Sequence, residues 1–460
     1  MNPICTLSGS AQARLIREGA LCSAELVDAH LERIAQVNPR LNAVVEVLAE
    51  QAREAARASD QRRAHAAPMG PLDGVPFSIK DSIEVAGTSC SAGTLGLRHA
   101  PRSRRDATLV ARLRAAGAIP LARTNLPDLL FAFESDNLIY GRTNNPYDVS
   151  RTSGGSSGGE AALIAACGSP FGLGSDAAGS VRLPAHFCGI ASIKPTSGRL
   201  PRTGHVPPAG GWIETLWQIG PLARRVEDLY TMMALLTGPD GQDHTVVPMP
   251  YGDPRAIDVA GLRIAWFADN GIAAPAPETD ALVRRAAQAL GAEERRPPRI
   301  EESYDLEMEL IGPDGGDGLR AYLRQIGSTE THPLLDGWLA KLEPYRTGIE
   351  GFAKYWESLY RFRSAMFEFS QDYDALLSPA CANPAVPHGT SVDEATFRGF
   401  SYTMTHNVTG WPAAVVRCGE SPEGLPIALQ VAARPWREDV ALAVALRLEE
   451  LFGGWKAPAE

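Results

Sequence analysis

Two serine clusters flanked by glycine are the segments of this 460-residue chain best suited to chemistry. The first is GGSSGG at residues 154–159 and the second is GSDAAGS at residues 174–180, which sets Ser156 and Ser180 24 positions apart. Glycine has no Cβ atom, so the backbone of such loops can adopt positive φ and approach a ligand closely. Together with Lys80, these serines indicate a hydrolase that works without histidine.

The second cluster has the composition of an oxyanion-binding loop. Ala177, Ala178 and Gly179 directly precede Ser180, so successive main-chain N–H groups can face one point beside its hydroxyl. Convergent donors of this kind stabilise the negative charge that develops on a carbonyl oxygen during acyl transfer. We therefore expect backbone donors from Ala177, Ala178, Gly179 and Ser180.

Lys80 is the candidate base. A serine hydroxyl must lose its proton as it attacks, and a lysine can accept that proton only when it is neutral. Its pKa must then be lowered from about 10.4 by burial. Val75, Phe77 and Ile79 precede Lys80 and predict a buried strand that would supply such surroundings.

A Gly-Ser run by itself is most often a linker. Here Glu160 to Ala166 follow at once, and these strong helix formers predict that the loop opens a helix over 160–167. A short strand is predicted at 171–174, and another at 118–122 after a helix that carries Leu109, Val110 and Leu113 and is capped by Asp106. Residues 11–65 are predicted to be helical. This alternation is typical of an α/β protein.

Three separated segments resemble the conserved patterns of the amidase signature family. They are GVPFSIKD at 74–81, GGSSGG at 154–159 and GSDAAGSVRLP at 174–184, and weaker similarity extends over nearly the whole chain. The resemblance implies one large α/β domain, 1–460, with a central mixed β-sheet covered by helices on both faces. Within it we expect a helical N-terminal segment (8–65), a catalytic core (66–240) and a sheet-completing, substrate-side part (255–455).

The resemblance also implies a role for each site residue. Lys80 matches the family's lysine, Ser156 its bridging serine, which follows a cis peptide bond, and Ser180 its nucleophile. Ser157, Asp176 and Arg182 are expected to support the nucleophile loop. At position 178 this chain has alanine where many members have glycine, which adds a methyl group near the substrate carbonyl. The implied reaction needs no cofactor, and the sequence has no CxxC or HExxH metal motif.

The residues on the substrate side favour apolar amides. Trp212, Ile213, Leu216 and Trp217 are expected to line the pocket, because ligand pockets are built mostly from such side chains. Residues 134–148 look closest to the branch of the family that resembles fatty-acid amide hydrolase. We expect hydrolysis of hydrophobic or aryl amides, with esters and carbamates (urethanes) as secondary substrates. The alternative within the family is the amidase subunit of a glutamine-dependent aminoacyl-tRNA amidotransferase.

A second alternative is a Ser-His-Asp esterase of the α/β-hydrolase class. Residues 155–159 satisfy the GxSxG elbow pattern, with His388 or His406 as the histidine. An elbow follows a strand, whereas residues 144–153 are polar and rich in turn formers. His186 is predicted to be a packed core histidine.

Composition narrows the partners and the compartment. The 44 basic and 54 acidic residues give a net charge of −10, which opposes binding to nucleic acid or anionic membranes. No apolar run approaches the roughly 18 residues of a membrane span. Seven scattered cysteines fit a reducing compartment, so a cytoplasmic monomer or homodimer acting on a small molecule is expected. One hypothesis for the glycine-rich segment 312–333 is a mobile lid.

Overall fold

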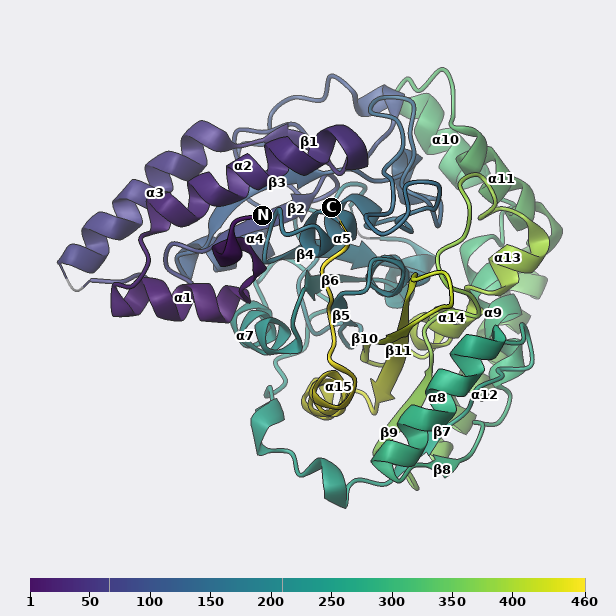
Figure 1. The fold of residues 1–460 in the computed structure, drawn as a ribbon. Coiled ribbons are helices and arrows are strands. Elements are labelled where there is room, and N and C mark those ends of the chain that lie inside the picture. The colour runs from purple at the N-terminus through teal and green to yellow at the C-terminus, as the bar shows by residue number, and fades with distance from the viewer. Residues whose placement is uncertain (66, 209, 460) are drawn as a thin grey trace.

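A computed structural model describes residues 1–65, 67–208 and 210–459, and one continuous β-sheet organises it (Figure 1). The sheet has eleven strands. β2 runs parallel to β3 and β4, and β7 runs parallel to β8 and β9, whereas the other neighbouring strands are antiparallel. The predicted mixed sheet is therefore confirmed. In sheet order the strands are β1 (Val44–Val47), β3 (Ile119–Thr124), β2 (Pro76–Lys80), β4 (Phe171–Asp176), β6 (Gln218–Ala223), β5 (Ala191–Lys194), β10 (Ala413–Glu420), β11 (Pro426–Ala433), β9 (Ala375–Pro379), β7 (Ile264–Trp266) and β8 (Glu293–Glu294).

Helices cover both faces of the sheet. Successive strand residues point to opposite sides, and the apolar side chains on both sides are buried against helices. Leu222 and Ala223, for example, belong to two separate hydrophobic clusters. One cluster contains residues of α1 (Gly9–Glu18), α4 (Thr108–Ala115), α7 (Val226–Leu236), α8 (Pro277–Leu290) and α15 (Glu438–Phe452). The other contains residues of α2 (Ser23–Leu41), α3 (Ala49–Ala64), α5 (Gly158–Ala165) and α6 (Arg182–Phe187).

A further group of helices lies on the side of the molecule away from α1, α2 and α3 (Figure 1). An aromatic cluster holds part of this group together, with ring centroids 4.5 Å apart for Phe133 and Phe400 and 5.1 Å apart for Trp338 and Phe397. These helices are α9 (Ser303–Ile311), α10 (Asp317–Gln325), α11 (Pro333–Leu342), α12 (Ile349–Phe369), α13 (Glu394–Arg398) and α14 (Ser401–Val408).

Two local predictions are wrong. Strand β1 interrupts the region 11–65, where the sequence predicts only helices, because residues 44–47 pair with β3. Asp106 does not cap α4, since its carboxylate accepts a hydrogen bond from the N–H of Ala86 at 2.8 Å and pairs with Arg114 at 2.9 Å. In both cases long-range partners outweigh local propensity.

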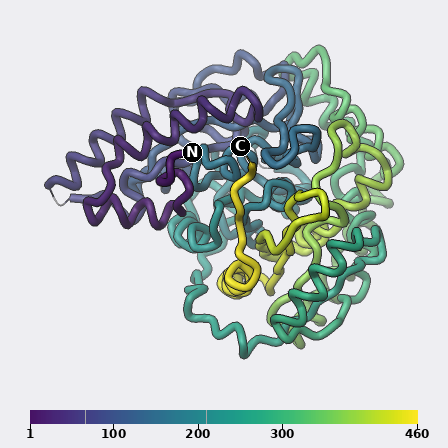
Figure 2. The backbone as a smooth tube through the Cα atoms, viewed as in Figure 1, coloured from purple at the N-terminus to yellow at the C-terminus, as the bar shows by residue number. Residues whose placement is uncertain are grey.

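The end of the chain returns to the N-terminal part of the molecule. Figure 2 shows the segment after α15 running back toward the N-terminal part of the molecule. The indole N–H of Trp455 donates to the carbonyl of Ala165 in α5 at 3.1 Å, which fastens this segment to the helix that follows the GGSSGG loop. Among the described residues, no helix has the length and apolar character needed to cross a membrane.

Candidate active site

Lys80 is the last residue of β2, and the parallel strand β4 lies beside β2. The carboxyl ends of parallel strands meet at one edge of a sheet, which is where α/β proteins place their ligands. The ammonium group is fully buried, and Nζ lies 2.6 Å from Oγ of Ser156. Burial lowers the pKa of Lys80 to about 7, against the opposing effect of the Asp176 and Glu160 carboxylates. The neutral amine of Lys80 is therefore much more accessible near neutral pH than that of an exposed lysine.

Ser156 lies in the loop that leads into α5. The Gly155–Ser156 peptide bond is cis, as the resemblance implied. The neighbouring Ser157 is also buried, and its N–H donates to the carbonyl of Ser180 at 3.0 Å. This hydrogen bond joins the two serine clusters and brings Ser156 and Ser180 to the wall of the same cavity.

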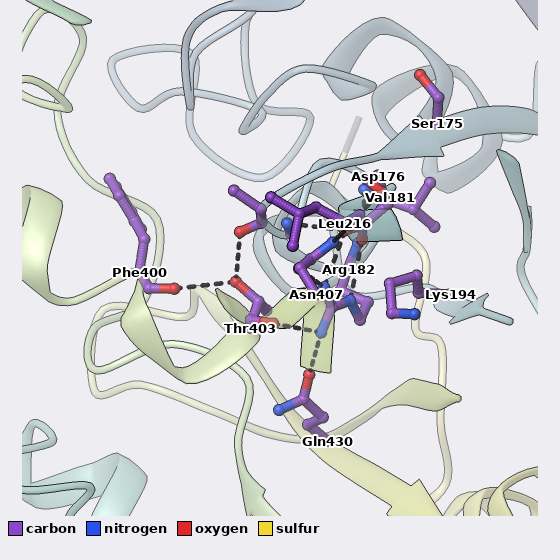
Figure 3. Close-up of polar contacts among 12 residues, drawn as sticks. Ser175, Asp176, Val181, Arg182, Lys194, Leu216, Phe400, Thr403, Asn407 and Gln430 are labelled. Carbon is purple, nitrogen blue, oxygen red and sulfur yellow. Dashed lines mark hydrogen bonds and ion pairs between the residues drawn. The ribbon is translucent and has the colours of Figure 1, made fainter. Parts of the chain in front are cut away.

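A buried ion pair supports the loop that carries Ser180 (Figure 3). Asp176 ends β4 and accepts two hydrogen bonds from the Arg182 guanidinium, at 2.8 and 2.9 Å. The same guanidinium donates to Gln430 at 2.8 Å, and Asn407 donates to Asp176 at 3.0 Å. Burial opposes ionisation of Asp176, but the charge and hydrogen bonds of Arg182 outweigh it and hold the pKa of Asp176 below its usual range. Asp176 and Arg182 thus stabilise the loop between them.

The backbone N–H groups of residues 177–180 differ in their hydrogen bonding, and Ala177, Ala178 and Ser180 line the cavity. Within the described residues, the N–H groups of Ala177, Ala178 and Ser180 have no protein acceptor. The N–H of Gly179 differs, because it donates to the Asp176 carboxylate at 2.8 Å. Of the four N–H groups predicted to bind an oxyanion, three are therefore not used by protein acceptors, and that of Gly179 supports the loop.

The glycine at 179 is required, whereas the alanine at 178 fits without strain. Gly179 has φ +121°, and a Cβ atom there would lie 2.2 Å from the Thr403 hydroxyl oxygen. Ala178 does not have a positive φ, and its carbonyl accepts a hydrogen bond from Thr403 at 2.8 Å. Its methyl group narrows the cavity that it lines.

The cavity beside Ser180 has a volume of about 130 Å³ and mostly apolar walls. Of the four predicted pocket residues, Ile213, Leu216 and Trp217 line it. Trp212 does not, because its side chain is 40% exposed and packs against Phe352 instead. The other wall consists of residues 129–133, Ile311 and Trp338. The segment 312–333 contributes no lining residue.

Two polar residues near Lys80 were not identified from the sequence. Ser175 Oγ lies 3.3 Å from Lys80 Nζ and 3.0 Å from Nε2 of His205. The alternation of β4 beside Asp176 could have indicated Ser175. His205 has no such signal, because it reaches the site through a long-range β-bridge with Ile83.

The histidines of the esterase alternative do not lie at the serine clusters. His388 contacts Glu134 at 3.7 Å, and neither it nor the buried His406 lines the cavity. Residues 144–153 form only isolated β-bridges, so no strand leads into a nucleophile elbow. His186 is buried, as predicted, but it lies on α6, where the Ala428 N–H donates to its Nδ1 at 2.9 Å. Across the described part of the chain, no group of three or more His, Cys, Asp or Glu side chains is arranged to hold a metal ion.

Known proteins share this chain's sequence and fold over nearly its whole length. The profile of the Amidase family matches residues 25–442. Fatty-acid amide hydrolase 2 of Homo sapiens is 32% identical, with coverage of 100% of this chain and 91% of that protein. A glutamyl-tRNA(Gln) amidotransferase subunit from Roseiflexus castenholzii is 35% identical, with coverage of 96% and 95%.

Among solved structures, the chain matches one described as a vestigial protein complex that reveals the evolutionary origins of an s-triazine catabolic enzyme. The TM-score is 0.90 at 29% identity, and the match covers 98% of this chain and 100% of that one. The family profile and the relatives agree with the three motifs and with the observed sheet. The chain therefore belongs to the amidase signature family of amide-hydrolysing enzymes.

Proposed function

We propose that this chain hydrolyses hydrophobic or aryl amides through an acyl-enzyme, with Ser180 as nucleophile, Ser156 as proton relay and Lys80 as base. The observation that carries the proposal is the 2.6 Å contact between Lys80 Nζ and Ser156 Oγ behind an apolar cavity that Ser156 and Ser180 both line. The lowered pKa of Lys80 supports its role, because only the neutral amine has a lone pair that accepts a proton.

In the proposed acylation step, Ser180 Oγ forms a bond to the carbonyl carbon, and the carbonyl π electrons move onto oxygen. The Ser180 proton passes to Ser156 as the proton of Ser156 passes to Lys80. The N–H groups of Ala177, Ala178 and Ser180 are the donors proposed to stabilise the oxyanion. When the C–N bond breaks, the leaving nitrogen takes a proton back along the same path.

In the deacylation step, water attacks the acyl-enzyme and gives its proton to the same relay. The carboxylic acid product leaves, and Ser180 regains its hydroxyl proton. Esters and carbamates present a carbonyl carbon to the same nucleophile, so we propose them as secondary substrates. No step requires a metal or a cofactor.

The proposed preference for apolar substrates rests on the cavity walls. Ile213, Leu216, Trp217 and Trp338 line the cavity, and Asp176, the one acidic residue among the described residues that line it, is already paired with Arg182. A small polar amide such as glutamine would find little to hydrogen-bond there, and desolvating it without compensation costs free energy.

A second candidate is the amidase subunit of a glutamine-dependent amidotransferase. The 35% identity with the glutamyl-tRNA(Gln) amidotransferase subunit of Roseiflexus castenholzii is the observation that favours it. The two candidates differ in the acyl group that each accepts.

A substrate panel separates them. For an acyl series of p-nitroanilides, kcat/KM should rise a few-fold with each added methylene, since each buried methylene contributes about 0.8 kcal/mol. Glutamine should be hydrolysed poorly in the same assay. Matched aryl esters and carbamates would rank the secondary activities. If glutamine proves to be the best substrate, the amidotransferase candidate replaces this one.

A further inference from the structure

A second polar contact reaches Lys80 beside that of Ser156. Ser175, the penultimate residue of β4, lies between Lys80 and the imidazole of His205, with Oγ 3.3 Å from Nζ and 3.0 Å from Nε2. Ser175 and His205 are buried, and both line the cavity that Ser180 lines. The mechanism proposed above leaves both residues without a role.

The surroundings of His205 fix its tautomer. Nδ1 lies 2.9 Å from the carbonyl oxygen of Pro207, which can only accept a hydrogen bond, so Nδ1 carries the proton. Nε2 then holds the lone pair of a neutral ring. Burial, with smaller contributions from the charges of Lys80 and Arg202, lowers the pKa of His205 to about 3, so the ring stays neutral over the working pH range.

The tautomer sets the direction of the hydrogen bonds that follow. Because Nε2 can only accept, the hydroxyl of Ser175 donates its single proton to it. Ser175 then faces Lys80 with lone pairs alone, so an N–H of Lys80 donates to Ser175. The lone pair of the neutral amine is left for the hydroxyl of Ser156, 2.6 Å away.

We propose that His205 is a positioning residue, which acts through Ser175 to direct the lone pair of Lys80 at the hydroxyl proton of Ser156. The inference rests on the proposed role of Lys80 as base. The same arrangement serves both protonation states of Lys80. The ammonium that forms during attack donates hydrogen bonds to Ser175 and Ser156, and neither hydroxyl has to rotate. Without an acceptor at position 205, the Ser175 proton is free to occupy the lysine lone pair.

Ser82, two carboxylates and Trp217 also lie near Lys80 or His205. Ser82 Oγ lies 3.3 Å from the same Nε2, farther than Ser175. Asp176 and Glu160 are the charged groups that influence the pKa of Lys80, and a substitution of His205 leaves both in place. The ring of His205 also packs on Trp217, with centroids 4.6 Å apart.

The substitution His205→Phe keeps an aromatic ring against Trp217 and removes the acceptor. We expect kcat to fall about tenfold, the size of one hydrogen bond, with KM changed less than about twofold. The acid limb of the kcat/KM profile should move to lower pH, because Ser175 now stabilises neutral Lys80. His205→Gln, whose side-chain carbonyl can accept from Ser175, should regain part of the lost kcat.

A double-mutant cycle with Ser175→Ala gives the deciding result. If His205 acts through Ser175, His205→Phe causes no further loss of kcat in the Ser175→Ala background. Equal losses in both backgrounds would overturn the inference, as would an unchanged kcat in His205→Phe. Ser82→Ala is the matched control and should keep kcat within about twofold, since Ser82 contacts Nε2 but not Lys80. A loss in Ser82→Ala equal to that in Ser175→Ala would also overturn it.

Two checks keep the cycle interpretable. Thermal unfolding of each variant shows that it folds, and His205→Leu replaces His205→Phe in the cycle if the latter does not. Lys80→Ala is assayed alongside. An active Lys80→Ala enzyme contradicts the proposed function itself, whereas an inactive one combined with an additive cycle contradicts only the role of His205.

Discussion

The floor and the walls of the cavity are built in different ways. The floor is a layer of buried polar groups that includes Asp176, which lines the cavity, and Lys80 and Arg182 behind it. Lys80 contacts Ser156 at 2.6 Å, and Arg182 donates to Asp176 at 2.8 and 2.9 Å. The walls consist of apolar side chains from distant segments, such as Ile213 and Trp338. These side chains are held by van der Waals packing and, for Trp338, by an edge-to-face contact with the ring of Phe397. Substitutions in the floor should therefore stop the reaction or destabilise the fold, while those in the walls should change which substrate is preferred.

The largest effect is expected at Lys80. Lys80→Ala should lower kcat by about 10³-fold or more, because it removes the general base. In the wild type, kcat/KM should rise as pH increases through about 7 and then level off, since the deprotonated amine is the working form. Rates measured from pH 5 to 9 test both points.

Lys194 offers a matched control for this pH dependence. It is a second fully buried lysine, and burial lowers its pKa to about 7 as well, but it donates to the Pro195 carbonyl, whereas Lys80 contacts Ser156. Lys194→Met should leave the midpoint of the acid limb where it is. A midpoint that moves with Lys194 and not with Lys80 would contradict the assignment.

A large loss of stability is expected at Arg182. Arg182→Met leaves the Asp176 carboxylate buried without its counter-charge, so the free energy of unfolding should fall by about 3–5 kcal/mol. The pKa of Asp176 is held below its ordinary 3.8, so this stabilisation is present above that pH and is lost as pH falls toward the native pKa. Urea denaturation at pH 7 and pH 3 measures both.

The exposed pair of Arg284 and Asp280 provides the comparison for Arg182. The Arg284 side chain is 51% exposed, and solvent screens its 2.9 Å contact. Arg284→Ala should change the free energy of unfolding by less than about 0.5 kcal/mol. Similar losses for the two arginines would mean that the buried network does not support the loop as described.

Among the substitutions in the site, the smallest effect is expected in the walls. Ile213→Val removes one methylene from the cavity lining, so kcat/KM for a large apolar anilide should fall about fourfold, from about 0.8 kcal/mol per methylene. Trp212→Ala, which alters a larger side chain outside the cavity, should leave the preference for substrate size unchanged. A size preference that depends on Trp212 and not on Ile213 would place the acyl group elsewhere.

The floor was largely predictable from the sequence because its motifs are short. The buried strand ending at Lys80 and the loop opening α5 each lie within a few consecutive residues. The family resemblance implied that Asp176 and Arg182 support the nucleophile loop, and their pairing was seen only in the structure. The mixed sheet with helices on both faces was implied by the family resemblance. The division into segments 8–65, 66–240 and 255–455 stays a prediction.

The parts that sequence reasoning missed depend on contacts between distant residues. His205 reaches Ser175 through tertiary structure, and Gly179 turns its N–H to Asp176 rather than to the cavity. Trp212 and Trp217 have similar sequence surroundings, yet one packs outside against Phe352 and the other lines the cavity beside His205. Local patterns do not distinguish such neighbours.

The identity of the nucleophile is the central claim, and covalent labelling tests it most directly. A fluorophosphonate probe phosphonylates an activated serine, and peptide mass spectrometry then locates the adduct. The account predicts an adduct on Ser180 in the wild-type enzyme, none in Ser180→Ala, and much slower labelling in Lys80→Ala. An adduct on Ser156 or Ser157, or hydrolysis by Ser180→Ala at the wild-type rate, would contradict it.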